Sequence, residues 1–300
     1  MDMGSEADLV AAARAGIADM GPRFDRDVLR ETAALYAPLV RRQPGAGVRV
    51  ESDLAYGDHA RQRFDLFAPE RAAGAPLMIF IHGGGFVAGS KTVDADFYRN
   101  IGLYFARHGV IAMIANYRLA PDHVWPAGTE DVAALVGWAR GNAGWLGGDP
   151  RAVFLFGQSA GAAHVTGYLS APDHWPGETS GVAGGIVMSG VYRAFGDRVG
   201  PGTLAYFGDD EDARRAACPL TRAAANRTPM MIGVMEFDPP DIAVHSFELA
   251  AALTRAVGQA PYFRWYEGHN HASTVYGIGS GQDEVGQDIL AFIAGRRPVA

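Results

Sequence analysis

The chain has 300 residues, of which 48% are hydrophobic and 20% are charged, the proportions of an ordinary globular protein with a large core. Its net charge of -7 argues against a nucleic-acid partner, and its single cysteine, Cys218, excludes an intrachain disulfide. The sequence shows neither a signal-peptide pattern nor an apolar stretch of membrane-spanning length, so we expect a cytoplasmic protein without a membrane partner. Metal-ligand spacings are also missing, and we expect no metal and no cofactor.

Two helices are predicted ahead of the first strand. Apolar residues recur at helical spacing over residues 9–20 and 25–39. Helices in this place do not fit inside a sheet, so we expect residues 1–45 to lie across it as part of a cap. Alternating apolar and polar residues in Val48–Tyr56 and Arg63–Phe67 then predict an antiparallel hairpin at the sheet edge.

A glycine-rich loop follows the next predicted strand. Leu77–Ile81 lacks polar alternation, as a parallel strand covered on both faces does, and it runs directly into His82–Phe86. The three successive glycines of this loop leave backbone N–H groups free of side chains, so we expect the loop to bind an oxyanion. We expect His82 to orient the loop by hydrogen bonding and not to act as a base.

Helices and strands then alternate. The pattern predicts a helix over residues 94–108, a buried strand over Val110–Ala115, a proline-punctuated loop over residues 116–127, and a helix that begins with the capping-type residues Thr129, Glu130 and Asp131. Repeated alternation of this kind predicts an α/β fold in which helices cover both faces of a mostly parallel sheet.

A nucleophile elbow is predicted at the centre of the chain. The apolar run Val153–Phe156 reads as a buried strand, Gly157–Gly161 has the pattern G-x-S-x-G, and the residues after it have helical character. Ser159 therefore lies at a strand-to-helix turn that presents its hydroxyl at the carboxyl edge of the sheet. The first free N–H groups of the helix point toward any charge that develops beside Ser159.

Three further strands complete the predicted sheet. Residues 182–188 form the first, and residues 192–228 after it show no strand pattern, so we expect them to cover Ser159 as a second part of the cap. Met230–Met235 ends in an acidic stretch, and a helix over residues 242–257 with Phe247 toward the core follows it. Tyr262–Tyr266 is the last strand, before the histidine-containing residues 267–273 and a final helix.

Successive strand ends thus deliver a glycine loop, a serine, an acid and a histidine to one edge of the sheet, where open α/β sheets bind ligands. A histidine activates a serine hydroxyl by taking its proton, and a carboxylate fixes the tautomer of that histidine. The acid is Asp238, Glu236 or Asp241, and the base is His271 or His269. Of these candidates we favour Asp238 and His271.

Four stretches, His82–Phe86, Tyr117–His123 with Pro126-Ala127, Gly157–Gly161 and Asp238-Pro239, resemble the hormone-sensitive-lipase-like carboxylesterases of the α/β-hydrolase fold. The resemblance implies a single domain over residues 1–300 with a helical cap, no metal, and hydrolysis of a small-molecule carboxylic ester. It implies Ser159 as nucleophile, Asp238 as acid and His271 as base. Its implied oxyanion hole consists of the backbone N–H groups of Gly84, Gly85 and Ala160.

The sequence defines the substrate pocket and the substrate less closely than it defines the candidate catalytic residues. We expect Phe86, Tyr206 and Phe207 to line the pocket, together with Phe24 and Tyr36. The elbow has Gln158 and Ala162 where the hormone-sensitive-lipase group usually has Asp and Gly, a pattern nearer to arylformamidase-like esterases. An arylformamidase or amidase is therefore the alternative activity, and a non-catalytic small-molecule receptor is a further alternative. Whether the chain forms a homo-oligomer is left open by the sequence.

Overall fold

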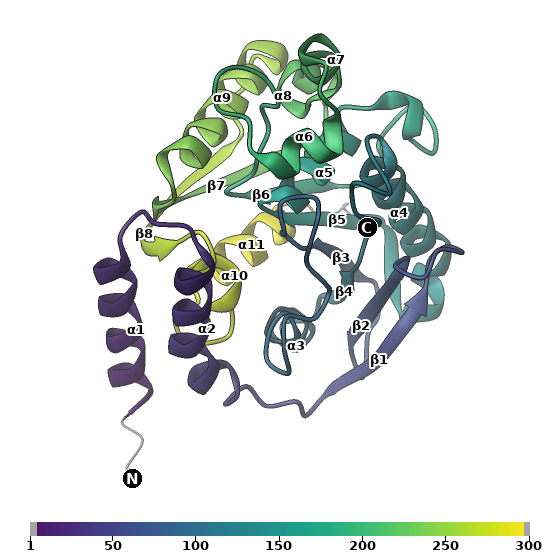
Figure 1. Cartoon of the computed structure of the whole chain (residues 1–300). Helices are drawn as coiled ribbons and strands as arrows, with labels where there is room; N and C mark the ends of the chain where they lie inside the picture. Colours follow the sequence, from purple (N-terminus) through teal and green to yellow (C-terminus); the bar gives the residue numbers. More distant parts are fainter. Residues whose placement is uncertain (1–4, 297–300) are drawn as a thin grey trace.

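The computed structural model of the chain describes residues 5–296, so residues 1–4 of the expected cap lie outside the described part. An eight-stranded sheet runs through the centre, and helices cover both of its faces (Figure 1). The strands are β1 (Val48–Ala55), β2 (Arg63–Pro69), β3 (Ala75–Ile81), β4 (Ile111–Ala115), β5 (Gly148–Gln158), β6 (Gly184–Met188), β7 (Met230–Phe237) and β8 (Tyr262–Asn270).

The strand order is β1-β2-β4-β3-β5-β6-β7-β8. β1 and β2 form the predicted antiparallel hairpin at one edge, and all pairs from β4 to β8 are parallel. The predicted α/β fold is therefore confirmed. Since the parallel strands share one direction, their carboxyl ends meet at one edge of the sheet, and this edge collects the loops that carry the expected site.

The two faces of the sheet have separate apolar cores. Successive residues of β3 point to opposite faces, so Met78 and Phe80 pack into one core and Leu77 and Ile79 into the other. The helices that cover the sheet are α1 (Glu6–Met20), α2 (Arg26–Val40), α3 (Arg99–Arg107), α4 (Ala127–Leu146), α5 (Ala160–Leu169), α9 (Pro240–Val257), α10 (Ser273–Tyr276) and α11 (Glu284–Ala294).

The two expected cap segments take different places. α1 and α2 lie side by side next to β8 and α10 (Figure 1), and Ile17, Met20 and Tyr36 join the core of that face. Residues 192–228 are all described and contain helices but no strand, as predicted. Their helices are α6 (Pro201–Phe207), α7 (Glu211–Ala217), α8 (Pro219–Arg222) and the 3₁₀ turn η2 (Ala223–Ala225); a second 3₁₀ turn, η1 (Pro172–His174), follows α5.

Several predicted details are wrong. The helix expected from residue 94 begins at Arg99, because the Asp94 carboxylate accepts hydrogen bonds from the backbone N–H groups of Asp96 (2.7 Å) and Phe97 (3.1 Å) and holds a turn there. Phe247 does not enter the core: it is 52% exposed and packs beside Phe263.

The last strand is longer than predicted. β8 continues past Tyr266 to Asn270, because its pairing with β7 resumes after an irregularity and places Asn270 opposite Phe237. His269 therefore belongs to the strand, and His271 is the first residue after it.

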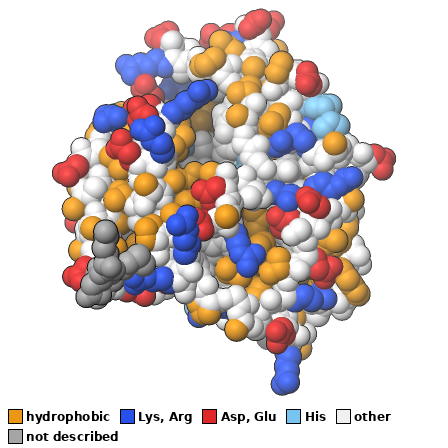
Figure 2. Space-filling view, turned by 60° about the horizontal axis from the view of Figure 1, so that its bottom comes forward, with side chains coloured by type: hydrophobic (Ala, Val, Ile, Leu, Met, Phe, Trp, Pro, Cys, Tyr) orange, Lys and Arg blue, Asp and Glu red, His pale blue; other side chains and the backbone are white. Residues whose placement is uncertain are grey.

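The surface is mixed in character. On the face shown in Figure 2, basic, acidic and apolar side chains are interspersed. Within residues 5–296, none of the helices combines the length and the hydropathy that crossing a bilayer requires.

Candidate active site

Ser159 lies at the turn between β5 and α5 in a strained conformation, with φ 56° and ψ -123°. Such a conformation in a residue other than glycine costs about 1–3 kcal/mol and persists where its surroundings fix it. The Ser159 N–H group donates to the carbonyl of Met188 on β6 (3.0 Å). A side chain at Gly161 would collide with the backbone of Ile81, and one at Gly157 would lie 2.5 Å from the Gly161 carbonyl oxygen. The two glycines of the motif therefore permit the tight turn.

His271 and Asp238 form a buried pair. Their side chains approach to 3.0 Å between Nδ1 and Oδ1, and the two residues are 2% and 3% exposed. The second carboxylate oxygen of Asp238 accepts hydrogen bonds from the Ser189 hydroxyl (2.7 Å) and the Met235 N–H (2.9 Å). Because an ionised carboxylate only accepts hydrogen bonds, Nδ1 of His271 carries the proton of the neutral ring. In this tautomer Nε2 of His271 is the acceptor nitrogen of the ring.

That acceptor is unused. Nε2 of His271 is buried and has no hydrogen-bond partner among the residues that the structure describes. A hydrogen bond of 2.9 Å from the side-chain amide of Gln158 to the backbone carbonyl of His271 ties the elbow to the histidine turn. Gln158 directly precedes Ser159, so this bond brings the serine turn and the turn that carries His271 together.

His269, the rival base, has both ring nitrogens occupied. Its Nδ1 lies 3.0 Å from the Ser273 hydroxyl, and its Nε2 lies 3.2 Å from Glu284 and 3.1 Å from the amide of Gln282. Burial alone would raise the pKa of Glu284, but the hydrogen bond and the charge of His269 lower it to about 2. His269 therefore belongs to a separate network with Glu284 as its carboxylate.

The rival acids also lie in other contacts. Glu236 accepts a hydrogen bond from the backbone N–H of Gly268 (2.7 Å), and Asp241 pairs with Arg198 at the surface (2.6 Å). Of the three acidic candidates, Asp238 is the one in contact with His271.

The glycine loop after β3 lies directly beside the elbow, since a Cβ atom at Gly83 would be 3.0 Å from Cβ of Ser159. Gly84 and Gly85 have φ of 132° and 59°, values that L-residues rarely adopt. Within residues 5–296, the backbone N–H groups of Gly84, Gly85 and Ala160 donate no hydrogen bond. These three donors are available to an anion beside Ser159.

His82 contacts its own loop. Its Nδ1 lies 2.6 Å from the carbonyl of Gly83, and its carbonyl accepts a hydrogen bond from the Tyr117 hydroxyl (3.1 Å). Burial lowers the pKa of His82 to about 4, so the ring is neutral at pH 7 and donates from Nδ1.

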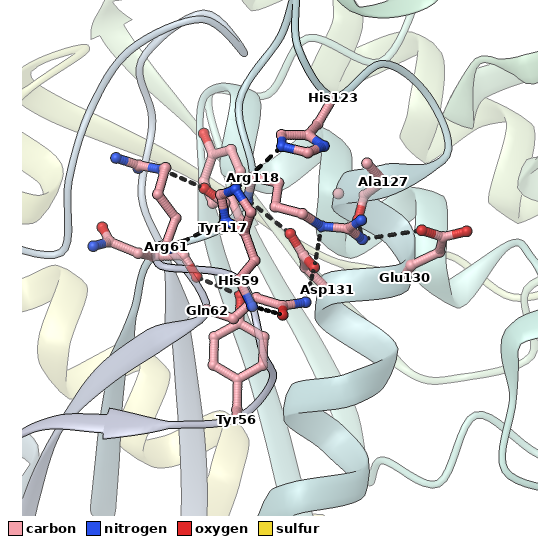
Figure 3. Close-up of polar contacts among 12 residues, drawn as sticks. Tyr56, His59, Arg61, Gln62, Tyr117, Arg118, His123, Ala127, Glu130 and Asp131 are labelled. Atoms are coloured by element: carbon pink, nitrogen blue, oxygen red, sulfur yellow. Dashed lines mark hydrogen bonds and ion pairs between the residues drawn. The ribbon is translucent and has the colours of Figure 1, made fainter.

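The loop between β4 and α4 is fixed by a buried carboxylate (Figure 3). Asp131 accepts hydrogen bonds from the backbone N–H and side chain of Arg118 (2.7 and 2.9 Å) and from Gln62 (2.8 Å). The prediction that Asp131 caps the helix is therefore wrong: α4 begins four residues earlier, and Asp131 clamps the loop to the hairpin. Farther along this loop, Ala120 donates to the carbonyl of Phe86 (3.1 Å), so the clamp also supports the glycine loop.

The three predicted pocket aromatics form a cluster with Ala160. Phe86 stacks on Tyr206 at 5.0 Å, and Phe207 lies 5.7 Å from Phe86. Phe86 and Tyr206 are 1% and 2% exposed, so Phe207 is the ring of this group with exposed area. Tyr36 lies elsewhere, with its hydroxyl bonded to Gln282 (2.7 Å).

Sequence reasoning missed two contacts of the candidate triad. Ser189 binds Asp238, and its position directly after a predicted strand is a signal that could have identified it. Phe24, between α1 and α2, packs edge-on against His271 with ring centroids 4.3 Å apart. Phe24 was expected in the pocket, but its contact with the imidazole has no signal in the sequence.

The fold is that of solved esterases with the α/β-hydrolase fold. A family model named BD-FAE matches residues 64–179. The hyperthermophilic esterase from the archaeon Pyrobaculum calidifontis superposes with a TM-score of 0.72 at 23% identity, covering 90% of this chain and 92% of that one. An esterase of the bacterial hormone-sensitive lipase family superposes with a TM-score of 0.68 at 22% identity, covering 99% of both chains.

Among curated proteins, the probable isoprenylcysteine alpha-carbonyl methylesterase ICME of Oryza sativa subsp. japonica is 24% identical over 273 residues, which are 82% of this chain. The chain spans 64% of the length of that relative. The resemblance predicted from the motifs is confirmed: the chain is similar to hormone-sensitive-lipase-like esterases of the α/β-hydrolase fold.

Proposed function

We propose that the protein hydrolyses small carboxylic esters through an acyl-enzyme formed on Ser159, with His271 as general base and Asp238 as the carboxylate that orients it. The observation that carries the proposal is the environment of His271: Nδ1 is bonded to Asp238, and Nε2 is buried and without a partner in the described part of the chain. The esterase names of the similar proteins support the same reaction.

In the first half of the reaction, Nε2 of His271 accepts the proton of the Ser159 hydroxyl while Oγ bonds to the ester carbonyl carbon. The tetrahedral intermediate then collapses, the alkoxide leaves, and His271 returns the proton to it. Water repeats the sequence on the acyl-enzyme, releasing the carboxylic acid and restoring Ser159. Asp238 keeps its negative charge and stabilises the imidazolium at both stages.

The charge that develops on the carbonyl oxygen meets the three free N–H groups of Gly84, Gly85 and Ala160. Ala160 is the first residue of α5, so the positive end of that helix dipole also points at the oxygen. Donors fixed before the reaction need no reorganisation, and removal of one such donor costs about a hundredfold to a thousandfold in kcat.

We further propose that the protein works in the cytoplasm on a small-molecule ester and without a nucleic-acid partner. The net charge of -7 and the single cysteine support this assignment. The interspersed charges on the face in Figure 2 are also unlike the basic stripe of a nucleic-acid surface.

The test is Ser159→Ala, assayed with p-nitrophenyl acetate and butyrate. We expect a loss of kcat on the order of a millionfold, because single removals in such triads cost about that much. Ser246→Ala is the control: this buried serine of α9 has a hydroxyl without a partner in the described residues, and its loss should leave turnover unchanged.

An organophosphonate should label the parent chain at Ser159. Turnover by Ser159→Ala close to the parent rate would refute the proposal.

A further inference from the structure

We propose that the N-terminal helix pair α1–α2 positions the general base, acting through the hydroxyl of Thr32 on the side chain of Asn270; the inference rests on the function proposed above for His271. The helix pair is then more than a cover over the substrate. Its contacts fix the turn on which the base is carried.

The turn around His271 is closed by side chains on both sides of that residue. The amide oxygen of Asn270 accepts hydrogen bonds from the backbone N–H groups of Ala272 (3.1 Å) and Ser273 (2.9 Å). The Ser273 hydroxyl accepts one in return from the Asn270 N–H (2.9 Å). Because His271 lies within this closed turn, the orientation of the Asn270 side chain determines where the His271 backbone sits.

The orientation of Asn270 is in turn fixed by α2. Its side-chain amide donates to the Thr32 hydroxyl (2.9 Å), and that hydroxyl donates to the sulfur of Met20 on α1 (3.8 Å). One hydroxyl thus joins both helices to the turn. Thr32 and Asn270 are fully buried, so loss of this bond leaves the Asn270 amide without access to water.

Two more contacts from the helix pair reach the same turn. Phe24 packs edge-on against the His271 ring, at 4.3 Å between centroids. On the other side, Arg14 of α1 binds Glu284 (2.6 Å), which contacts His269 two residues before the base. The helix pair and the connection between its helices therefore contact the imidazole itself and, through Thr32 and through Arg14 with Glu284, the two residues that precede it.

The reaction rate depends on the exact position of His271, because His271 is the proposed base. A displacement of about 1 Å at a reacting group can cost on the order of a hundredfold in rate. Thr32→Val keeps the shape of the side chain and removes the acceptor, so the Asn270 amide keeps only a weak contact of 4.0 Å to the Met20 sulfur. We expect the turn to relax and His271 to lose its alignment with Ser159.

The experiment compares Thr32→Val, Thr32→Ala and Thr32→Ser with the parent chain. Valine and alanine should lower kcat on the order of tenfold with little change in KM, since a misplaced base slows the chemical step. Serine keeps the hydroxyl and should restore most of the rate. Thr254→Val is the matched control, because the Thr254 hydroxyl bonds only within its own helix, to Ala250 (2.7 Å), and its loss should leave kcat unchanged.

A second measurement separates positioning from general destabilisation. The proton on Nδ1 of His271, held between the ring and Asp238, should give a low-field ¹H NMR signal that shifts or broadens in Thr32→Val and Thr32→Ala but not in Thr254→Val. Unchanged kcat and an unchanged signal in the folded variants would overturn the inference, as would equal losses in Thr254→Val. If the parent chain itself neither hydrolyses esters nor reacts with a phosphonate, the proposed function fails, and the signal still decides whether Thr32 positions His271.

Discussion

Two histidines only two residues apart have opposite surroundings. His269, inside β8, uses both ring nitrogens in contacts with Ser273, Gln282 and Glu284. His271, after the strand, uses one ring nitrogen for Asp238 and keeps the other without a partner in the described chain. Each ring has a carboxylate, so the presence of a histidine–carboxylate pair does not by itself identify a base. The two rings differ in that Nε2 of His271 has no partner among the described residues, and in that Gln158 ties the His271 turn to the elbow.

The comparison is tested most strongly by replacing each histidine with glutamine. His271→Gln should lower kcat by on the order of a millionfold, as loss of the histidine of a serine triad does. His269→Gln keeps a hydrogen-bonding side chain in its network, so the strand end should move by much less than 1 Å, and kcat should remain within about tenfold of the parent rate. Steady-state kinetics with p-nitrophenyl butyrate measure both. Equal losses, or the larger loss in His269→Gln, would contradict the assignment.

Replacing the carboxylates gives the next largest effect. In Asp238→Asn the one remaining oxygen is held by the Ser189 hydroxyl and the Met235 N–H, so an NH2 donor faces Nδ1 of His271 and disfavours its present tautomer. We expect kcat to fall by about ten thousandfold. Asp241→Asn is the control three residues away, where the carboxylate pairs with Arg198 at the surface and an effect within about twofold is expected, because exposed ion pairs contribute little. Comparable activity of the two variants would show that Asp238 does not serve His271.

The comparison of His269 with His271 also shows which features of the structure could be predicted from the sequence. Long apolar runs such as Leu77–Ile81 predicted the buried strands, because a parallel strand covered on both faces leaves little room for other patterns. The elbow at Ser159 was predictable because a strained turn requires small residues at fixed positions. Boundaries were less predictable: pairing of β8 with β7 is interrupted at Glu267 and Gly268 and resumes at Asn270, and the composition of this stretch does not indicate that the strand continues.

The surroundings of the two rings could not be predicted. Spacing placed His269 and His271 at the same strand end, but the partners that separate them come from distant positions. Thr32 and Asn270 are 238 residues apart in the chain, and their contact depends on how α2 packs against the turn. The local spacing of apolar residues does not indicate contacts between residues so far apart in the chain. Residues at strand ends can therefore be predicted from the sequence, whereas the distant side chains that orient them cannot.

The smallest expected effect is a change in the free energy of unfolding when the contact between His269 and Glu284 is removed. The folded pKa of Glu284, about 2, lies below its ordinary value of 4.5. A lowered pKa means that the folded state favours the carboxylate, so this contribution is present above pH 4.5 and is lost as the pH falls toward 2. The parent chain should therefore lose free energy of unfolding more steeply over this range than Glu284→Gln does.

Urea unfolding followed by circular dichroism at several pH values between 2 and 6 measures the two slopes. Glu267→Gln, which removes an exposed carboxylate from β8, is the control and should keep the parent slope. At pH 7, Glu284→Gln should retain most of the parent's rate of ester hydrolysis, because glutamine can still bond to His269 and because Asp238, not Glu284, contacts the proposed base His271. Parallel slopes for the parent and Glu284→Gln would mean that the pair at His269 contributes nothing to folding. A collapse of kcat in Glu284→Gln would instead mean that the two histidine networks act as one.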